Sequence, residues 1–308
     1  TEKANRMTEI AKGVLFSTLT VILSVVTSML VKILAQDDIA IIHILISRFW
    51  FSLPILFVFA FTIHQYRLFF INNKLAMSLR VVLGLTGISL WFLAIQNISL
   101  GLATALFQSS IIFVTLASPV FLNEKIGMYR WSAVIIGMVG VLIITNPFSS
   151  SLSYGVIFGI AAALTGAALS IILRKLGKSD SPVSVTLVHN CAGSIIVAIV
   201  GTTILPIPIN FLHNTDIWIL LLVLGVIASF LQLSVTLAYR HADAVVVTTL
   251  RYLQLPVAGI AGYFYFAEIP TIFELIGACA IFLSCLVIVW REFLRKTETV
   301  PEEAKLTT

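Results

Sequence analysis

The chain has 308 residues, of which 59% are hydrophobic and 11% are charged, and its mean hydropathy is +1.06. Soluble domains are about 45–50% apolar and about 25% charged, so the composition excludes a soluble fold of this size. The alternating ten-residue pattern of an outer-membrane barrel is absent. We therefore predict an all-α integral membrane protein. We interpret the net charge of +5 as a sign of membrane topology rather than of nucleic-acid binding.

Ten apolar segments that could cross a bilayer follow one another along the chain. In chain order they cover residues 13–36, 40–64, 74–96, 100–122, 130–146, 153–176, 182–206, 216–239, 244–266 and 271–290. The connections are short and contain turn-forming residues, which leaves no room for a soluble domain. We predict two five-helix halves, 13–146 and 153–291, and a disordered cytoplasmic tail at 292–308.

The distribution of lysine and arginine supports ten spans. With this count, 16 of the 19 basic residues lie on one side of the membrane, and the opposite loops hold none. The remaining three, Lys32, Arg48 and Arg251, fall within spans. Because basic residues favour the cytoplasmic side, we predict an inner-membrane protein with both termini in the cytoplasm.

Two stretches of the sequence indicate an internal repeat. Residues 104–124 and 248–268 are polar-centred spans that each end in a glutamate, and Glu124 and Glu268 are 144 residues apart. A span with small residues follows each one, at 133–140 and 277–284. Because an odd number of spans separates the two copies, they run in opposite directions. Inverted repeats of this kind are typical of secondary transporters, whose binding site lies between the halves.

The ninth segment, 244–268, carries charged and polar groups at membrane depth. Thr248, Arg251, Tyr252, Leu255 and Gly259 follow one another at steps of three or four residues, so in one continuous helix they share a face. Charged groups inside the bilayer are costly and are usually functional. We interpret this face as the wall of a polar cavity, and we expect the proline at position 256 to kink the helix.

Three basic side chains lie within spans, and no acidic residue lies at a comparable depth. Arg48 is about nine residues into the second segment, roughly 13 Å deep. Arg48 and Arg251 could clamp a carboxylate or phosphate. Alternatively, each could be a structural arginine bound to backbone carbonyls or extended to the surface. For Lys32 we expect the side chain to extend towards Asp37 and Asp38.

Further polar and aromatic residues lie in the third, fourth, seventh and eighth segments. These are Trp91, Phe92, Gln96, Asn97, Phe107, Gln108, Ser109, Ser110, His189, Asn190, Gln232, Thr236 and Tyr239. They could line a cavity for a ring or a cationic group, or they could form hydrogen bonds between helices. Motifs for nucleophilic, metal or phosphate chemistry are absent from the sequence. We therefore expect no enzyme activity, no metal and no cofactor.

Four runs together resemble the drug/metabolite transporter superfamily, in its EamA-type branch. They are RFWFSLPIL from Arg48, LRVVLGLTGISLWFLAI from Leu79, TALFQSSIIFVTLASPVFLNEKIGMYRW from Thr104 and YRHADAVVVTTLRYLQLPVAGIAGYFYFAEIPT from Tyr239. The resemblance implies ten helices in two inverted halves around a central cavity. Within the family, these motifs are most similar to those of S-adenosylmethionine uptake carriers, and they overlap with those of amino-acid exporters.

The resemblance also implies a set of substrate-binding residues. By matching position they are Arg48, Trp91, Gln108, Arg251, Tyr252 and Gln254. Part of the family has an acidic residue where this chain has Arg251, which leaves open whether the pocket prefers a carboxylate. The predicted function is secondary transport of a small amino-acid-like metabolite by alternating access. A membrane-embedded enzyme, an assembly scaffold and a channel are the alternatives.

Overall fold

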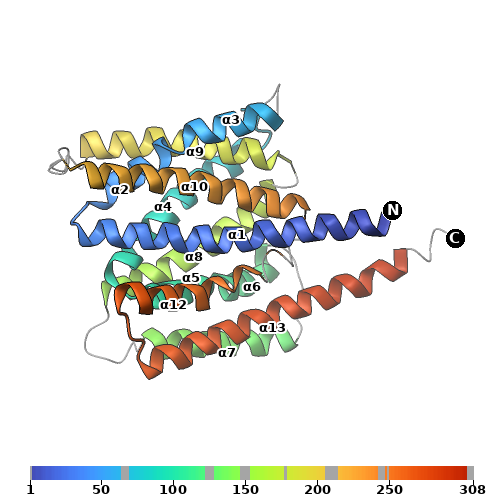
Figure 1. The fold of residues 1–308 in the computed structure, drawn as a ribbon. Coiled ribbons are helices and arrows are strands. Elements are labelled where there is room, and N and C mark those ends of the chain that lie inside the picture. Colours follow the sequence, from blue (N-terminus) through green and yellow to red (C-terminus); the bar gives the residue numbers. More distant parts are fainter. Residues whose placement is uncertain are drawn as a thin grey trace.

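The computed structural model describes residues 2–63, 69–121, 128–145, 153–176, 179–204, 214–241, 247 and 250–303, and these ranges contain helices and no strand. The helices are α1 (Glu2–Gln36), α2 (Ile41–Trp50), α3 (Leu53–Ile63), α4 (Lys74–Asn97), α5 (Leu100–Gln108), α6 (Ser110–Phe121), α7 (Met128–Thr145), α8 (Tyr154–Leu176), α9 (Pro182–Ile199) with the π-helical turn η1 (Val200–Ile204), α10 (Thr215–His241), α12 (Gln254–Phe266) and α13 (Ile272–Glu303). Their axes lie roughly along one direction, as in a membrane bundle (Figure 1).

In the part of the chain that the structure describes, seven helical segments are long and apolar enough to cross a membrane. They are Ala11–Gln36, Ile41–Thr62, Lys74–Asn97, Leu100–Ala117, Tyr154–Leu173, Pro182–Thr203 and Thr215–Val235. Two shorter apolar segments, Trp131–Ile144 and Ile272–Ile288, lie where the fifth and tenth spans are predicted. The predicted ninth span includes residues 244–246, 248 and 249, which lie outside the described residues. Large apolar side chains such as Phe264 and Val120 are exposed, which suits a surface covered by lipid.

The second span is broken near its middle. Helix α2 ends at Trp50, two turn residues follow, and α3 begins at Leu53. Pro54 explains the position of the break, because a proline has no N–H and its ring clashes with the carbonyl group four residues earlier, at Trp50. The break is buried: the Ser52 hydroxyl donates to the carbonyl of Phe49 at 2.8 Å, and Ser52 is only 1% exposed.

The ninth span is also broken, which corrects the expectation of one continuous helical face. The helix is interrupted at Tyr252 and Leu253 before α12 begins at Gln254. Pro256 lies four residues after Tyr252, so the same clash explains this interruption. Of the predicted face, Leu255 is buried, Gly259 is exposed, and Thr248 lies outside the described residues.

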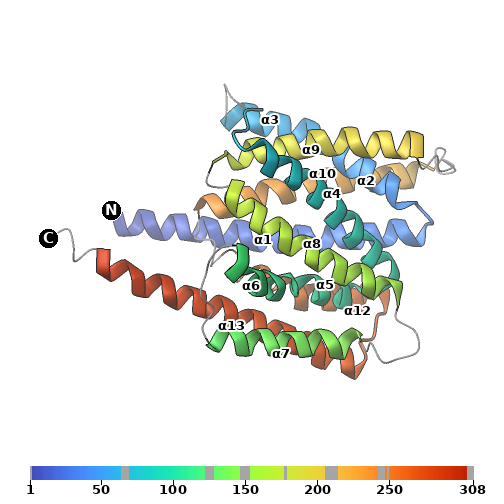
Figure 2. The same cartoon turned by 180° about the vertical axis from the view of Figure 1, so that it is seen from behind.

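Three pairs of helices make the most extensive contacts: α7 with α13, α4 with α8, and α1 with α10. In the first pair, small residues let the backbones approach closely. A Cβ added at Gly140 would lie 2.8 Å from the carbonyl oxygen of Gly277. Seven residues earlier on α7, the carbonyl of Ala133 accepts a hydrogen bond from Ser284 at 2.5 Å. Because position 140 pairs with 277 and position 133 with 284, the two helices run antiparallel (Figure 2).

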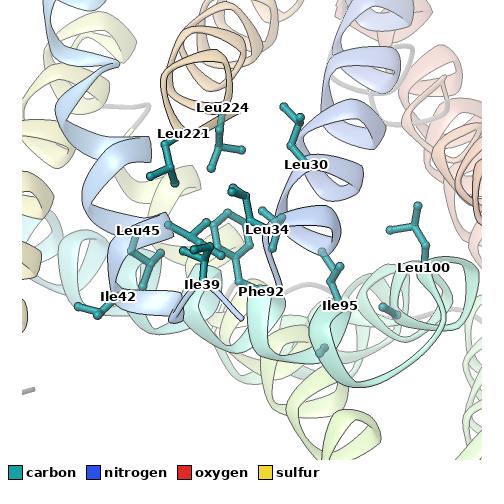
Figure 3. Packing of buried hydrophobic residues seen from close by; sticks show 14 of the residues in the cluster. Leu30, Leu34, Ile39, Ile42, Leu45, Phe92, Ile95, Leu100, Leu221 and Leu224 are labelled. Carbon is teal, nitrogen blue, oxygen red and sulfur yellow. The ribbon is translucent and has the colours of Figure 1, made fainter. Parts of the chain in front are cut away.

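The largest apolar cluster lies where α1, α2, α4, α5 and α10 meet (Figure 3). Its labelled members are Leu30, Leu34, Ile39, Ile42, Leu45, Phe92, Ile95, Leu100, Leu221 and Leu224. This cluster joins helices from both halves of the chain. Therefore the two halves share a core and do not form separate domains.

Helix α13 continues to Glu303, through most of the segment expected to be a disordered tail. The stretch from Arg291 to Val300 contains no glycine or proline and is rich in residues of good helix propensity. It can therefore extend the helix beyond the apolar part of α13. The start of α1 and the end of α13 lie at the same end of the bundle (Figure 1). Residues 304–308 lie outside the described residues.

Candidate functional site

Gln108 and Arg251 meet at two helix breaks that face each other. In a regular helix the Leu255 N–H would bond to the carbonyl of Arg251. Because Pro256 cannot donate to Tyr252, the Leu255 N–H bonds to the Tyr252 carbonyl instead, at 3.1 Å. This leaves the Arg251 carbonyl available, and Gln108 Nε2 donates to it at 3.1 Å. A polar side chain of α5 thus replaces the missing helical hydrogen bond.

The break between α5 and α6 has the same hydrogen-bond pattern. The Ile112 N–H bonds to the carbonyl of Ser109 at 2.9 Å, three residues back rather than four. The carbonyl of Gln108 is left available and lies 3.6 Å from Cys285 Sγ, which donates to it. No proline lies at this break; instead the Ser109 hydroxyl bonds to the Leu106 carbonyl at 2.5 Å, an interaction that can bend helices. We call Ser109 and Tyr252–Leu253 the paired helix breaks.

Other predicted residues gather around the paired helix breaks. Trp91 of α4 packs against Phe107, the neighbour of Gln108, with ring centroids 4.8 Å apart. Tyr252 is 1% exposed and lies edge-on to Phe282 of α13. Gln254 is buried at the start of α12. The structure therefore brings Trp91, Gln108, Arg251, Tyr252 and Gln254 into one region, and Arg48 lies near the ring of Phe92, the neighbour of Trp91.

Gln108→Leu is expected to lower the free energy of unfolding by about 1–3 kcal/mol, because it leaves the Arg251 carbonyl without its donor in a partly buried setting. Thermal unfolding of the purified chain in detergent would measure the loss. Gln108→Glu should have a similar effect, since a carboxylate has no N–H to donate. If Gln108→Leu unfolds at the same temperature as the unmodified chain, then the hydrogen bond does not hold the two breaks together.

Arg48, at the end of α2, lies in a separate cluster of basic residues. Its side chain is buried, with the guanidinium carbon 5.1 Å from the ring centroid of Phe49 and 6.0 Å from that of Phe92. Arg80 of α4 is near enough for its charge to interact with Arg48, and both interact with His189 of α9. We call Arg48, Arg80 and His189 the cationic cluster.

The sequence pattern groups Arg80 with the basic residues that flank the membrane, so its place in the cluster was not predicted. Arg80 is the seventh residue of α4, roughly 9 Å into the helix, and only its depth within the predicted segment 74–96 could have distinguished it. Gly84, one turn later, makes the space for the cluster. A Cβ at Gly84 would overlap Arg80 Nη1 and would lie 2.6 Å from His189 Cε1.

Lys32 forms an ion pair with Glu268, not with Asp37 or Asp38 as expected. Its Nζ also donates to the carbonyl of Ile98 at 2.8 Å, and the other oxygen of Glu268 accepts the N–H of Leu100 at 2.8 Å. Lys32 is close to the end of α1, but the helix directs its side chain towards α12 and the start of α5 rather than towards the following turn. The pair joins three elements at the end of the bundle opposite the start of α1.

A pocket between α3, α9 and α10 has a volume of about 10 Å³, which is about the space that one water molecule needs. It is lined by Leu56, Phe59, Val183, Thr186, Leu187 and Leu233, none of which is a predicted site residue. The described residues also contain no group of histidine, cysteine and acidic side chains that could hold a metal ion.

A model of the EamA-like transporter family matches residues 11–146 and, a second time, residues 153–290. The chain belongs to the EamA-like transporter family. The two matches show that the EamA domain is duplicated. Together with the apolar helices found among the described residues, this family match makes the chain a multi-pass membrane protein of a transporter family and not an enzyme.

Curated relatives of this EamA-like protein are named as transporters of different small molecules. A riboflavin transporter of Vibrio cholerae serotype O1 is 30% identical, over 67% of this chain and 68% of the relative. An S-adenosylmethionine uptake transporter of Rickettsia felis is 26% identical over 80% and 81%. The pseudopaline exporter CntI of Pseudomonas aeruginosa is also 26% identical, over 68% and 72%. The resemblance to the EamA branch and to S-adenosylmethionine carriers is therefore confirmed.

A solved crystal structure has the same fold as this EamA-like chain. It covers 92% of this chain and 97% of its own length with a TM-score of 0.61 and a sequence identity of 14%. At this level of identity the match supports the fold alone. The helical arrangement described above is thus one that has been observed in a crystal.

Proposed function

We propose that this EamA-like protein is a secondary transporter that moves a small metabolite across the inner membrane by alternating access. The observation that carries the proposal is the duplicated EamA domain with a helix break in each half. Discontinuous helices that meet near the middle of the bilayer are the usual setting of transporter binding sites. In this arrangement, rocking of one half against the other opens the region of the paired helix breaks to each side in turn.

The proposed architecture is ten spans in two inverted repeats around a central site. Helices α7 and α13 occupy the same place in the two family matches, and their antiparallel contact is what two inverted copies would make. The other two extensive contacts also support this relation. Moving about 144 residues along the chain leads from α4 to α10 and from α1 to α8. The contact between α4 and α8 and the contact between α1 and α10 are therefore equivalent in the proposed repeat.

The proposed orientation has both ends of the chain in the cytoplasm. The start of α1 and the end of α13 lie at the same end of the bundle, and the basic loop residues favour the cytoplasmic side (Figure 1). A fluorescent protein fused to residue 308 is expected to be bright, and alkaline phosphatase fused at the same place inactive. Active phosphatase at this position would contradict the proposed orientation.

The proposed substrate is an amino acid or an amino-acid derivative, with S-adenosylmethionine as the first candidate, and riboflavin, which has no carboxylate or phosphate, is a candidate from another substrate class. Names of relatives supply both candidates. Arg48, Trp91, Gln108, Arg251, Tyr252 and Gln254 are the proposed binding residues. Aromatic faces such as that of Trp91 can hold rings or cationic groups, and a guanidinium can hold a carboxylate.

Transport by the purified protein in lipid vesicles tests the proposed function. Labelled S-adenosylmethionine, methionine and riboflavin are supplied outside the vesicles, and uptake is compared with that of vesicles without protein. We expect saturable uptake of at least one compound, and a loss of roughly tenfold or more in Arg251→Gln. Lys175→Gln, at the exposed end of α8, is the matched control and should transport normally. Uptake of none of the compounds would contradict the proposed substrate class.

A further inference from the structure

We propose that the cationic cluster of Arg48, Arg80 and His189 binds an anionic group, a carboxylate or a phosphate, of the transported molecule. This inference rests on the carrier function proposed above. It adds a second binding region to the protein, apart from the paired helix breaks, and states which chemical group of the substrate would bind there. The three residues come from α2, α4 and α9, at the level of the break between α2 and α3. The family resemblance pointed to Arg48 alone among them.

Buried nitrogen atoms in the cluster lack partners. Arg48 Nε, Arg80 Nε and His189 Nδ1 are inaccessible to solvent, and none forms a hydrogen bond within the described part of the chain. Arg48 is 6% exposed and His189 is 4% exposed. A buried polar group without a partner destabilises the fold, and a charged one does so more strongly. In native proteins a bound ion, ligand or water commonly supplies the missing partner of such a group.

The positive charge of the cluster is not balanced by its own helices. The sequences of α2, α4 and α9 contain no aspartate or glutamate. The ion pair described in the structure joins Lys32 of α1 to Glu268, which follows α12, so neither of its residues lies on α2, α4 or α9. Contacts of Arg48 with the rings of Phe49 and Phe92 compensate for only part of the buried charge. Two guanidinium groups remain charged at any pH of interest, so an anion would relieve their mutual repulsion.

The chemistry of the cluster suits an oxyanion better than a halide or a neutral group. A guanidinium presents N–H groups in a planar fork that matches two oxygens of a carboxylate or phosphate. The histidine adds a third donor from another helix. The side chains of Arg80 and His189 lie directly against Gly84, so a larger residue at position 84 would displace both.

Melting temperatures of the full-length protein test the proposal without knowledge of the natural substrate. The protein is purified in uncharged detergent with zwitterionic lipid, and melting is compared in chloride, acetate and inorganic phosphate at equal ionic strength. We expect acetate or phosphate to raise the melting temperature by roughly 2–4 °C relative to chloride. Arg48→Gln and Gly84→Ala should lose this rise, and Lys175→Gln should keep it.

The behaviour of Arg48→Gln in chloride distinguishes a ligand-binding arginine from a structural one. If Arg48 binds an anion, then without the anion its charge repels that of Arg80. Removing Arg48 relieves this repulsion, and the variant should melt at or above the melting temperature of the unmodified chain. Lower melting in chloride together with an equal rise in phosphate would overturn the proposal. No rise in either anion would also overturn it. A rise produced by phosphatidylglycerol but not by the free anions would assign the cluster to a lipid headgroup instead.

The outcome of this experiment is separate from that of the transport assay. Saturable transport without stabilisation by acetate or phosphate would retain the carrier and reject the anion site. Stabilisation that depends on Arg48, in a protein that transports no compound of the panel, would retain the site and reject the proposed metabolites.

Discussion

Gly140→Leu is expected to lower the free energy of unfolding by about 3 kcal/mol, because it forces a large side chain into a close contact between two helices. A Cβ at this position lies 2.8 Å from the Gly277 carbonyl oxygen and 2.9 Å from Ala280 Cβ. Both are parts of α13 that cannot rotate away, so α7 and α13 must separate. Because each of these helices has an apolar part shorter than the seven candidate spans, their mutual contact is important for keeping them in the bundle. Thermal unfolding and the yield of folded protein after purification would measure the loss.

Gly259→Leu is the matched control for this prediction. It makes the same change in another helix of the bundle, but a Cβ at Gly259 meets no atom within 4 Å. We expect its melting temperature to remain close to that of the unmodified chain. If Gly140→Leu is as stable as this control, then the contact between α7 and α13 is not close in the folded protein.

Lys32→Met is expected to destabilise the fold by about 2–3 kcal/mol, because it leaves the Glu268 carboxylate partly buried without its cation. Glu268→Gln should have a similar effect, since it leaves Lys32 with the Ile98 carbonyl alone. Gly262 makes room for the carboxylate, which a Cβ at that position would overlap. Melting of the purified protein, with exposed Lys74→Met as the control for loss of one charge, would measure both effects.

The double substitution Lys32→Met with Glu268→Gln tests whether the two side chains act as a pair. We expect it to cost at least about 1 kcal/mol less than the sum of the two single substitutions, since neither partner is then left with an unbalanced charge. Additive losses would mean that each residue stabilises the protein independently. In that case the hydrogen bond from Leu100 to Glu268, and not the ion pair, would be the important contact.

Sequence patterns predicted the helices well because bilayer hydrocarbon imposes a length and a composition on each span. Apolar segments predicted at 74–96 and 153–176 correspond to α4 and α8 within two residues. The breaks were harder to predict. Pro256 indicated a kink, but the interruption falls four residues earlier, where the proline ring meets the carbonyl of Tyr252. The break at Ser109 has no proline and arises from local hydrogen bonds that a hydropathy pattern does not contain.

The candidate site was predicted only in part, because its partners come from distant parts of the chain. The pairing of Gln108 with Arg251 spans 143 residues, and no local pattern indicates it. Arg80 was counted as a loop charge although its helix carries it into the bilayer. Lys32 has acidic neighbours in sequence, but the direction of its side chain along α1 selects Glu268. In each case the type of residue was informative, and the tertiary contact decided its role.

The two arginines of the cationic cluster belong to the first half of the proposed duplication, and His189 of α9 belongs to the second. Helices α2 and α4 carry Arg48 and Arg80, whereas α9 has no arginine and α10 has one only near its end, at Arg240. A transporter assembled from two identical half-size subunits would have to carry every such charge twice. Fusion of the halves into one gene removes that constraint. A single codon change then alters a residue in one half of the protein and leaves the equivalent residue in the other half unchanged. Relatives that share this duplicated fold can therefore change their cargo one residue at a time.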